Sequence, residues 1–138
     1  ATLSTHAEGP ELEAACRQIG GCPTGQARIT PAFRLPARYV IHAVGPVWRG
    51  GGHGEEEQLA GAYRSSMALA HEHGVRSIAF PSISTGIYGF PLDRAARIAV
   101  RELHGAAQRY PEIATIRMVA FSEPTWDAFV RAMEEEID

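Results

Sequence analysis

The sequence predicts an α/β domain in which helices cover both faces of a sheet. Short apolar segments typical of strands alternate with longer segments that have the 3.6-residue apolar period of helices, and this alternation is typical of such sheets. The 138 residues suffice for one domain with one core, and 45% of them are hydrophobic. That apolar content and the net charge of -3 exclude a disordered chain. We therefore expect a single domain over residues 1–138.

The first expected elements lie before residue 45. Gly9-Pro10 opens a helix from Pro10 to Ile19, which Gly20-Gly21 ends. Strands are expected from Gln26 to Thr30 and from Tyr39 to Val44, because prolines and glycines bound both segments.

The remaining elements alternate. A helix is expected from Glu55 to His73, a strand from Ser77 to Phe80, a helix from Pro91 to about Arg109, a buried strand from Thr115 to Phe121, and a last helix from Pro124. The side chains that we expect to be buried are Leu59, Tyr63, Met67, Ile78, Phe80, Met118, Val119 and Phe129.

Composition excludes several functional classes. The chain lacks the basic face that general nucleic-acid binding needs, and no window is apolar enough to span a membrane. No secretory signal opens at Ala1, and Cys16 and Cys22 are too few and wrongly spaced for a disulfide framework or a metal site. All 13 basic residues are arginines, so lysine Schiff-base chemistry is excluded. We expect a cytoplasmic protein with reduced thiols.

The segment from Pro81 to Pro91 is the most informative. It follows a strand and precedes a helix, and Gly86 and Gly89 allow a ligand to approach the backbone closely. The free N–H groups at the start of the next helix face the same region, which favours an anion site without a cationic side chain. Tyr88 can stack on a sugar or a base. Hydroxyl groups come from Ser82, Ser84 and Thr85. The alternative is an ordinary strand-to-helix turn.

Other candidate groups are weaker. The run from Gly50 to Gly54 resembles a phosphate loop, but the three glutamates that follow would repel phosphate, which favours a mobile surface loop or a lid. Glu55–Glu57 and Glu134–Glu136 are interpreted as solvated charges at helix ends. His42 is expected to be a hydrogen-bonded core histidine, and His71 and His73 to point to different sides of their helix.

Four runs together resemble macrodomains of the MacroD type. They are Gly9-Pro-Glu-Leu, Gly21-Cys-Pro-Thr-Gly-Gln-Ala-Arg-Ile-Thr30, Leu35-Pro-Ala-Arg-Tyr-Val-Ile-His-Ala-Val-Gly-Pro46 and Ser77-Ile-Ala-Phe-Pro-Ser-Ile-Ser-Thr-Gly-Ile-Tyr-Gly-Phe-Pro91. The resemblance implies a three-layer α/β/α fold with a mixed central sheet that binds ADP-ribose. It also implies hydrolysis of mono-ADP-ribose from acidic side chains of proteins or deacetylation of O-acetyl-ADP-ribose, without a metal or another cofactor.

The resemblance assigns the binding residues by position. Ser82 to Tyr88 resembles the second phosphate-binding loop of the family, in which the backbone N–H groups of Gly86, Ile87 and Tyr88 would bind the diphosphate. Tyr88 would also pack beside the distal ribose, and Phe121 resembles the aromatic residue that stacks on adenine. The expected partners are ADP-ribose, ADP-ribosylated proteins and O-acetyl-ADP-ribose, and the protein is expected to be a monomer.

The resemblance leaves the catalytic residues unassigned. In the family, a strand with an adenine-binding aspartate, an Asn-Ala-Ala-Asn strand end and a glycine-rich first phosphate loop with an aspartate precede a histidine, which His6 resembles. This chain contains no Asn and has no counterpart of those aspartates. We expect the full gene product to carry these elements upstream of His6. The alternatives to an enzyme are a module that binds ADP-ribose without turnover and an inactive fragment.

Overall fold

A computed structural model of the chain describes residues 22–31, 39–86, 88–120 and 122–137. Its elements are β1 (Ala27–Pro31), β2 (Tyr39–Ala43), α3 (Glu55–Glu72), β3 (Ser77–Pro81), α4 (Leu92–Arg109), β4 (Thr115–Val119) and α5 (Glu123–Glu136). Each begins within one residue of its predicted start, and every element with a predicted end finishes within two residues of it. The helix predicted from Pro10 to Ile19 lies outside the described residues.

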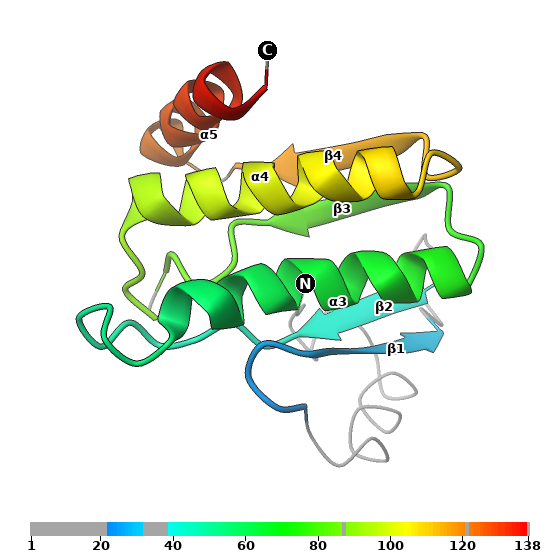
Figure 1. Cartoon of the computed structure of the whole chain (residues 1–138), viewed down its shortest axis with the longest axis horizontal. Helices are drawn as coiled ribbons and strands as arrows, with labels where there is room; N and C mark the ends of the chain where they lie inside the picture. Colours follow the sequence, from blue (N-terminus) through cyan, green and yellow to red (C-terminus); the bar gives the residue numbers. More distant parts are fainter. Residues whose placement is uncertain (1–21, 32–38, 87, 121, 138) are drawn as a thin grey trace.

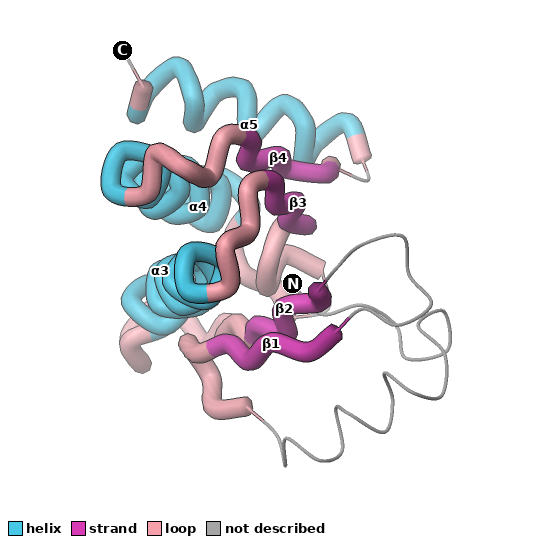
Figure 2. Tube along the Cα trace, turned by 90° about the vertical axis from the view of Figure 1, so that its right-hand side faces the viewer, coloured by secondary structure: helices cyan, strands magenta, loops and turns pink. Residues whose placement is uncertain are grey.

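The strands form one antiparallel and one parallel pair. β1 pairs antiparallel with β2, with Ile29 opposite Ile41, and β3 pairs parallel with β4, with Phe80 opposite Met118. Figures 1 and 2 show the strands in the spatial order β1, β2, β3, β4, with α3 and α4 side by side along one side of them. Because β3 and β4 are parallel, their carboxyl ends lie at the same edge, where the loop to α4 begins (Figure 1).

Local sequence explains where the helices begin and end. Three glutamates occupy the first turn of α3, where the helix dipole favours negative charge, and Gly74 follows the helix with φ 68°. The Ser122 hydroxyl caps α5 by accepting a hydrogen bond from the Thr125 N–H at 3.3 Å. No side chain caps α4, which begins after Pro91, so N–H groups of its first turn have no side-chain partner among the described residues.

The core lies between the helices and the strands. The predicted inner face of α3 is confirmed, since Leu59, Tyr63 and Met67 are at most 1% exposed. Phe80 of β3 and Phe129 of α5 are buried as predicted, whereas Ile78 and Met118 are partly buried and pack against the core.

The prediction that Val119 is buried is wrong. Its side chain is 41% exposed. Successive residues of a strand point to opposite faces, and Val119 shares a face with the exposed Arg117, whereas Ile116 and Met118 share the face that packs against the core. The interpretation of this segment as a strand buried on both faces missed that alternation.

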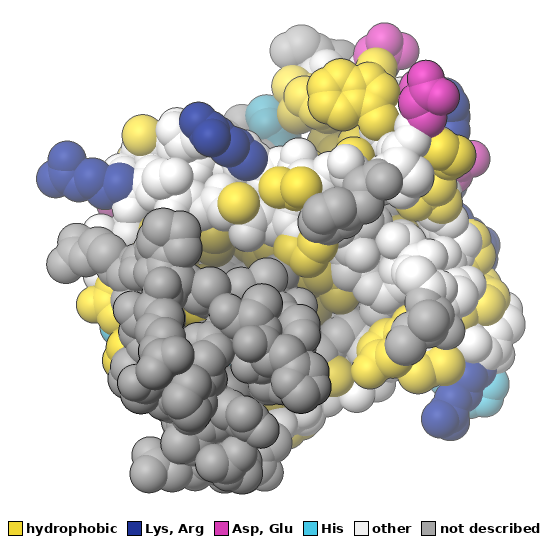
Figure 3. All heavy atoms as spheres, turned by 180° about the vertical axis from the view of Figure 1, so that it is seen from behind, with side chains coloured by type: hydrophobic (Ala, Val, Ile, Leu, Met, Phe, Trp, Pro, Cys, Tyr) yellow, Lys and Arg dark blue, Asp and Glu magenta, His cyan; other side chains and the backbone are white. Residues whose placement is uncertain are grey.

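Several large hydrophobic side chains are exposed. On α5 they are Trp126, Val130 and Met133, whereas Phe129 of the same helix is buried. Figure 3 shows hydrophobic side chains gathered at several places on the face seen from behind. Among the described residues, no helix combines the length and the apolarity needed to cross a bilayer.

Candidate functional site

The loop between β3 and α4 is folded tightly at the carboxyl end of β3. Ser84 has a positive φ of 67°, which is uncommon for a residue other than glycine, and Gly89 has φ 72°. Two backbone hydrogen bonds close the loop, from the Phe90 N–H to the Ser84 carbonyl and from the Gly89 N–H to the Gly86 carbonyl, both at 3.0 Å. The loop is therefore a defined structure whose backbone conformation two left-handed residues set.

The hydroxyl groups of the loop differ in their hydrogen bonding. The Thr85 hydroxyl donates to the Ser82 hydroxyl at 2.8 Å, and its oxygen also lies 3.1 Å from the Ser82 carbonyl oxygen. The Ser84 hydroxyl oxygen is buried and has no hydrogen-bond partner within the described part of the chain. The space beside it is filled by the backbone at Gly45, two residues after β2, where an added Cβ would lie 2.1 Å from that oxygen.

The rim of the loop is open. A Cβ added at Gly86 would meet no atom of the described residues within 4 Å, and the Tyr88 side chain is 38% exposed. The uncapped start of α4 follows directly, after Phe90 and Pro91. The sequence-predicted residues Ser82, Ser84, Thr85, Gly86 and Tyr88 thus share one short loop, whereas Ile87 and Phe121 lie outside the described residues.

Tyr63 of α3 contacts the first residues of the loop. Its hydroxyl oxygen accepts a hydrogen bond from the Ile83 N–H at 3.2 Å, and its ring packs against Phe80 with centroids 5.4 Å apart. Burial raises the pKa of Tyr63 well above its usual value, so the phenol remains neutral. Tyr63 was predicted to lie in the core, but its hydrogen bond to Ile83 was not predicted, because 20 residues separate Tyr63 from Ile83 in the sequence.

Trp48 supports the other end of the loop. Its backbone N–H donates to the Tyr88 carbonyl at 2.8 Å, and its ring packs against Phe90 with centroids 4.8 Å apart. The Arg94 guanidinium lies over the indole at 5.5 Å, a cation–π contact that places an exposed positive charge next to the loop. Sequence analysis singled out neither Trp48 nor Arg94.

Glu55 is not the solvated charge that its position at a helix end suggested. Its side chain is 1% exposed, and its carboxylate accepts backbone hydrogen bonds from Arg49 at 2.9 Å, Gly51 at 2.8 Å and His53 at 2.6 Å. Burial alone would raise the pKa of Glu55, but these bonds outweigh it and lower the pKa to about 2. The glycine run that precedes α3 is therefore organised around an internal carboxylate.

The histidines have structural partners. His42 Nε2 lies 3.0 Å from the Thr30 hydroxyl oxygen, and burial lowers the pKa of this half-buried imidazole, in agreement with the predicted hydrogen-bonded core histidine. His71, in the last turn of α3, pairs with Glu112, whereas Nδ1 of His73, which follows the helix, lies 3.0 Å from the Leu69 carbonyl oxygen, so the two rings have different partners.

Metal-binding residue types are scattered. Within residues 22–31, 39–86, 88–120 and 122–137, no three His, Cys, Asp or Glu side chains come together as metal ligands would. Cys22 is half-buried, and burial raises the pKa of its thiol.

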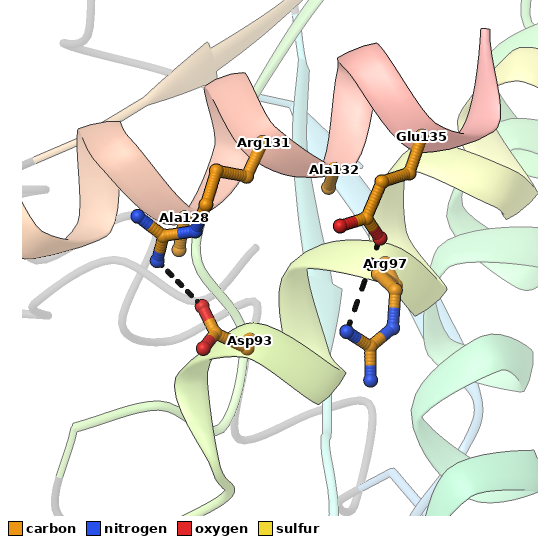
Figure 4. A pocket seen from close by; sticks show the side chains of 6 residues that line it. All are labelled: Asp93, Arg97, Ala128, Arg131, Ala132 and Glu135. Atoms are coloured by element: carbon orange, nitrogen blue, oxygen red, sulfur yellow. Dashed lines mark hydrogen bonds and ion pairs between the residues drawn. The ribbon is translucent and has the colours of Figure 1, made fainter.

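A shallow pocket between α4 and α5 carries paired charges. Figure 4 shows Asp93 facing Arg131, with Nη2 and Oδ1 2.7 Å apart, and Arg97 facing Glu135 at 4.0 Å. Because each of these charges already has a partner, the pocket joins two helices and offers no unpaired group to a ligand.

Comparison with known proteins identifies the family. Residues 4–99 match the Macro domain family. The chain therefore belongs to the macrodomains. A macrodomain-containing protein of Chlorobaculum tepidum is 51% identical over 127 residues, which are 92% of this chain and 74% of that protein. The O-acetyl-ADP-ribose deacetylase of Klebsiella pneumoniae is 50% identical over 123 residues, which are 86% of this chain and 70% of that enzyme.

Solved macrodomains have the same fold. The Oceanobacillus iheyensis macrodomain with ADP superposes with a TM-score of 0.88 at 37% identity, covering 95% of this chain and 72% of that one. The Trypanosoma brucei macrodomain in complex with ADP-ribose superposes with a TM-score of 0.84 at 36% identity, covering 93% of this chain and 53% of that one. The predicted α/β macrodomain fold, with parallel and antiparallel strand pairs, is confirmed.

Proposed function

We propose that this macrodomain binds ADP-ribose and that the loop between β3 and α4 holds the diphosphate. The observation that carries the proposal is the open rim of this loop, where Gly86 faces empty space next to the uncapped start of α4. Backbone N–H groups at a helix start attract an anion without a cationic side chain. Structural relatives with ADP and with ADP-ribose support this ligand class.

The proposed roles of the loop residues follow from their positions. The N–H groups of Gly86, Ile87 and Tyr88 donate hydrogen bonds to the diphosphate oxygens, and the exposed Tyr88 ring packs beside the distal ribose. Tyr63 and Trp48 hold the two ends of the loop, so little ordering is needed when the ligand binds. Phe121 stacks on adenine in this proposal, as its resemblance to the family's aromatic residue implies.

We further propose that the protein removes ADP-ribose from acidic side chains or deacetylates O-acetyl-ADP-ribose. The named deacetylase of Klebsiella pneumoniae supports a hydrolase among the relatives. The second candidate is a module that binds ADP-ribose without turnover. It is supported by the solved macrodomains with ADP and with ADP-ribose, because binding of the ligand is what those two structures record.

Isothermal titration of ADP-ribose into the parent chain and into Gly86→Glu tests the binding proposal. The parent should bind, and Gly86→Glu should not, because its carboxylate enters the site of the diphosphate. The fold should tolerate this substitution, since no atom lies within 4 Å of the added Cβ and φ is not positive.

Gly105→Glu is the matched control for charge. Gly105 lies in α4, and a Cβ there would meet only the end of the Arg109 side chain, at 4.0 Å. Its affinity should equal that of the parent. If a folded Gly86→Glu variant binds ADP-ribose as tightly as the parent, the ligand binds elsewhere. A separate assay distinguishes the hydrolase from the binding module: release of ADP-ribose from a modified acceptor, followed by chromatography.

A further inference from the structure

Glu55 is a buried carboxylate held by the backbone alone. Within the described residues no arginine pairs with it, and His53, whose Nδ1 lies 3.9 Å from Oε1, is itself 63% exposed. One oxygen, Oε2, accepts from the N–H groups of Arg49 and Gly51, and Oε1 accepts from that of His53. A buried charge without such bonds is strongly destabilising, so this arrangement fixes the loop and the carboxylate together.

The glycine run is therefore an anion nest that already contains its anion. Gly50 and Gly51 both have φ 91°, and Gly54 has φ 76°, and these left-handed residues let the N–H groups of the alternate residues 49, 51 and 53 converge on one carboxylate. A ligand phosphate would have to displace Glu55 from these N–H groups. The role of the glycine run therefore lies in the side chain that packs against it, and not in binding a phosphate.

The side chain that packs against the glycine run is that of Trp48. A Cβ at Gly51 would lie 2.9 Å from the Trp48 ring atom Cη2, so the Gly51 backbone packs directly against one edge of the indole. Phe90 and the Arg94 guanidinium contact the same ring. The carboxylate of Glu55, by fixing the Gly51 N–H, fixes one wall of the space that the indole fills.

Trp48 in turn fixes the peptide after Tyr88. The Tyr88 carbonyl accepts the Trp48 N–H at 2.8 Å, and the N–H of the same peptide, which belongs to Gly89, donates to the Gly86 carbonyl at 3.0 Å. Both ends of this peptide are thus hydrogen-bonded, which fixes its orientation relative to Trp48 and Gly86.

We propose that Glu55 is a positioning residue for the diphosphate-binding loop, acting through Gly51 and Trp48 on the Tyr88–Gly89 peptide. The inference rests on the proposed function, because it concerns the loop to which we assign the diphosphate. Glu55 itself touches no ligand. Its carboxylate keeps the Tyr88–Gly89 peptide in the orientation in which the Tyr88 carbonyl accepts the Trp48 N–H and the Gly89 N–H donates to the Gly86 carbonyl.

Glu55→Gln tests the inference, and Glu56→Gln is the matched control, because Glu56 is the exposed neighbour in the same helix turn. The glutamine amide places an N–H group where the carboxylate accepted one, so at least one backbone donor loses its acceptor. Two measurements are made on the whole chain: hydrogen–deuterium exchange of peptides covering residues 82–90 and 39–43, and isothermal titration with ADP-ribose.

The expected result is faster exchange in residues 82–90 of Glu55→Gln, with exchange in strand β2 unchanged and ADP-ribose affinity about tenfold weaker. Glu56→Gln should match the parent in both measurements. Glu55→Asp keeps the charge but shortens the reach, so it should fall between the parent and Glu55→Gln, and it replaces Glu55→Gln in the test if the latter does not fold.

Two results would overturn the inference. One is unchanged exchange in residues 82–90 of the folded variant, and the other is an equal rise in both peptides, which would mean general destabilisation. If the parent itself does not bind ADP-ribose, the proposed function fails, while the exchange data still decide whether Glu55 positions the loop.

Discussion

Gly45→Ala should displace the diphosphate-binding loop, because the added methyl group would clash with two of the loop's side chains. The added methyl group would lie 2.1 Å from the Ser84 hydroxyl oxygen and 2.5 Å from Ile83 Cγ2. The first distance is about 1.3 Å short of the 3.4 Å at which ordinary contact begins, so rotation of one hydroxyl does not relieve both clashes. Overpacking of this kind costs roughly 1–3 kcal/mol of folding free energy, and we expect ADP-ribose affinity to fall by about tenfold.

Gly52→Ala is the matched control for this prediction. Neither glycine has a positive φ, and a Cβ at Gly52 would meet no atom within 4 Å. Urea unfolding and isothermal titration with ADP-ribose should therefore give the parent's values for Gly52→Ala and reduced stability and affinity for Gly45→Ala. Parent-like values for both variants would refute the packing of the Gly45 backbone against Ser84.

Three further predictions concern single residues. Tyr63→Phe removes the acceptor of the Ile83 N–H and should lower the free energy of unfolding by roughly 1–3 kcal/mol in urea denaturation, so an unchanged midpoint would contradict that hydrogen bond. Phe121→Ala should weaken ADP-ribose binding by about 1–3 kcal/mol while leaving binding of ribose-5-phosphate, which has no base, unchanged; an equal loss for both ligands would argue against an adenine stack. The folded pKa of Glu55, about 2, lies below the ordinary 4.5, so its stabilisation is present above pH 4.5 and is lost as the pH falls toward 2. The urea midpoints of the parent and Glu55→Gln should accordingly converge between pH 4.5 and 2, whereas a constant difference would argue against this ionisation.

The order and bounds of the elements were predictable because local signals set them. Pro91 precedes α4, Gly74 follows α3, and the apolar stripe containing Leu59 and Met67 has the helical period. The position of the candidate site was predictable for a similar reason, since the loop from Ser82 combines glycines with a strand before it and a helix after it.

The contacts that support the loop were not predictable from local sequence. Twenty residues separate Tyr63 from Ile83, and forty separate Trp48 from Tyr88, so folding alone brings these partners together. Glu55 carries the ordinary signature of a solvated first-turn glutamate, and only the backbone conformation of the preceding glycines directs three N–H groups at it. The prediction that Val119 is buried was wrong for a simpler reason: the sequence of a short apolar strand does not reveal whether one or both of its faces are covered.

We propose above that the loop between β3 and α4 binds the diphosphate of ADP-ribose through its backbone N–H groups. A titration of ¹⁵N-labelled protein with ADP-ribose, followed by backbone amide chemical shifts, tests it most directly. We expect the largest saturable shifts at the amides of Gly86, Ile87 and Tyr88, with smaller ones at the first turn of α4. Largest shifts at residues 50–54, or no saturable shift in the loop between β3 and α4, would contradict it.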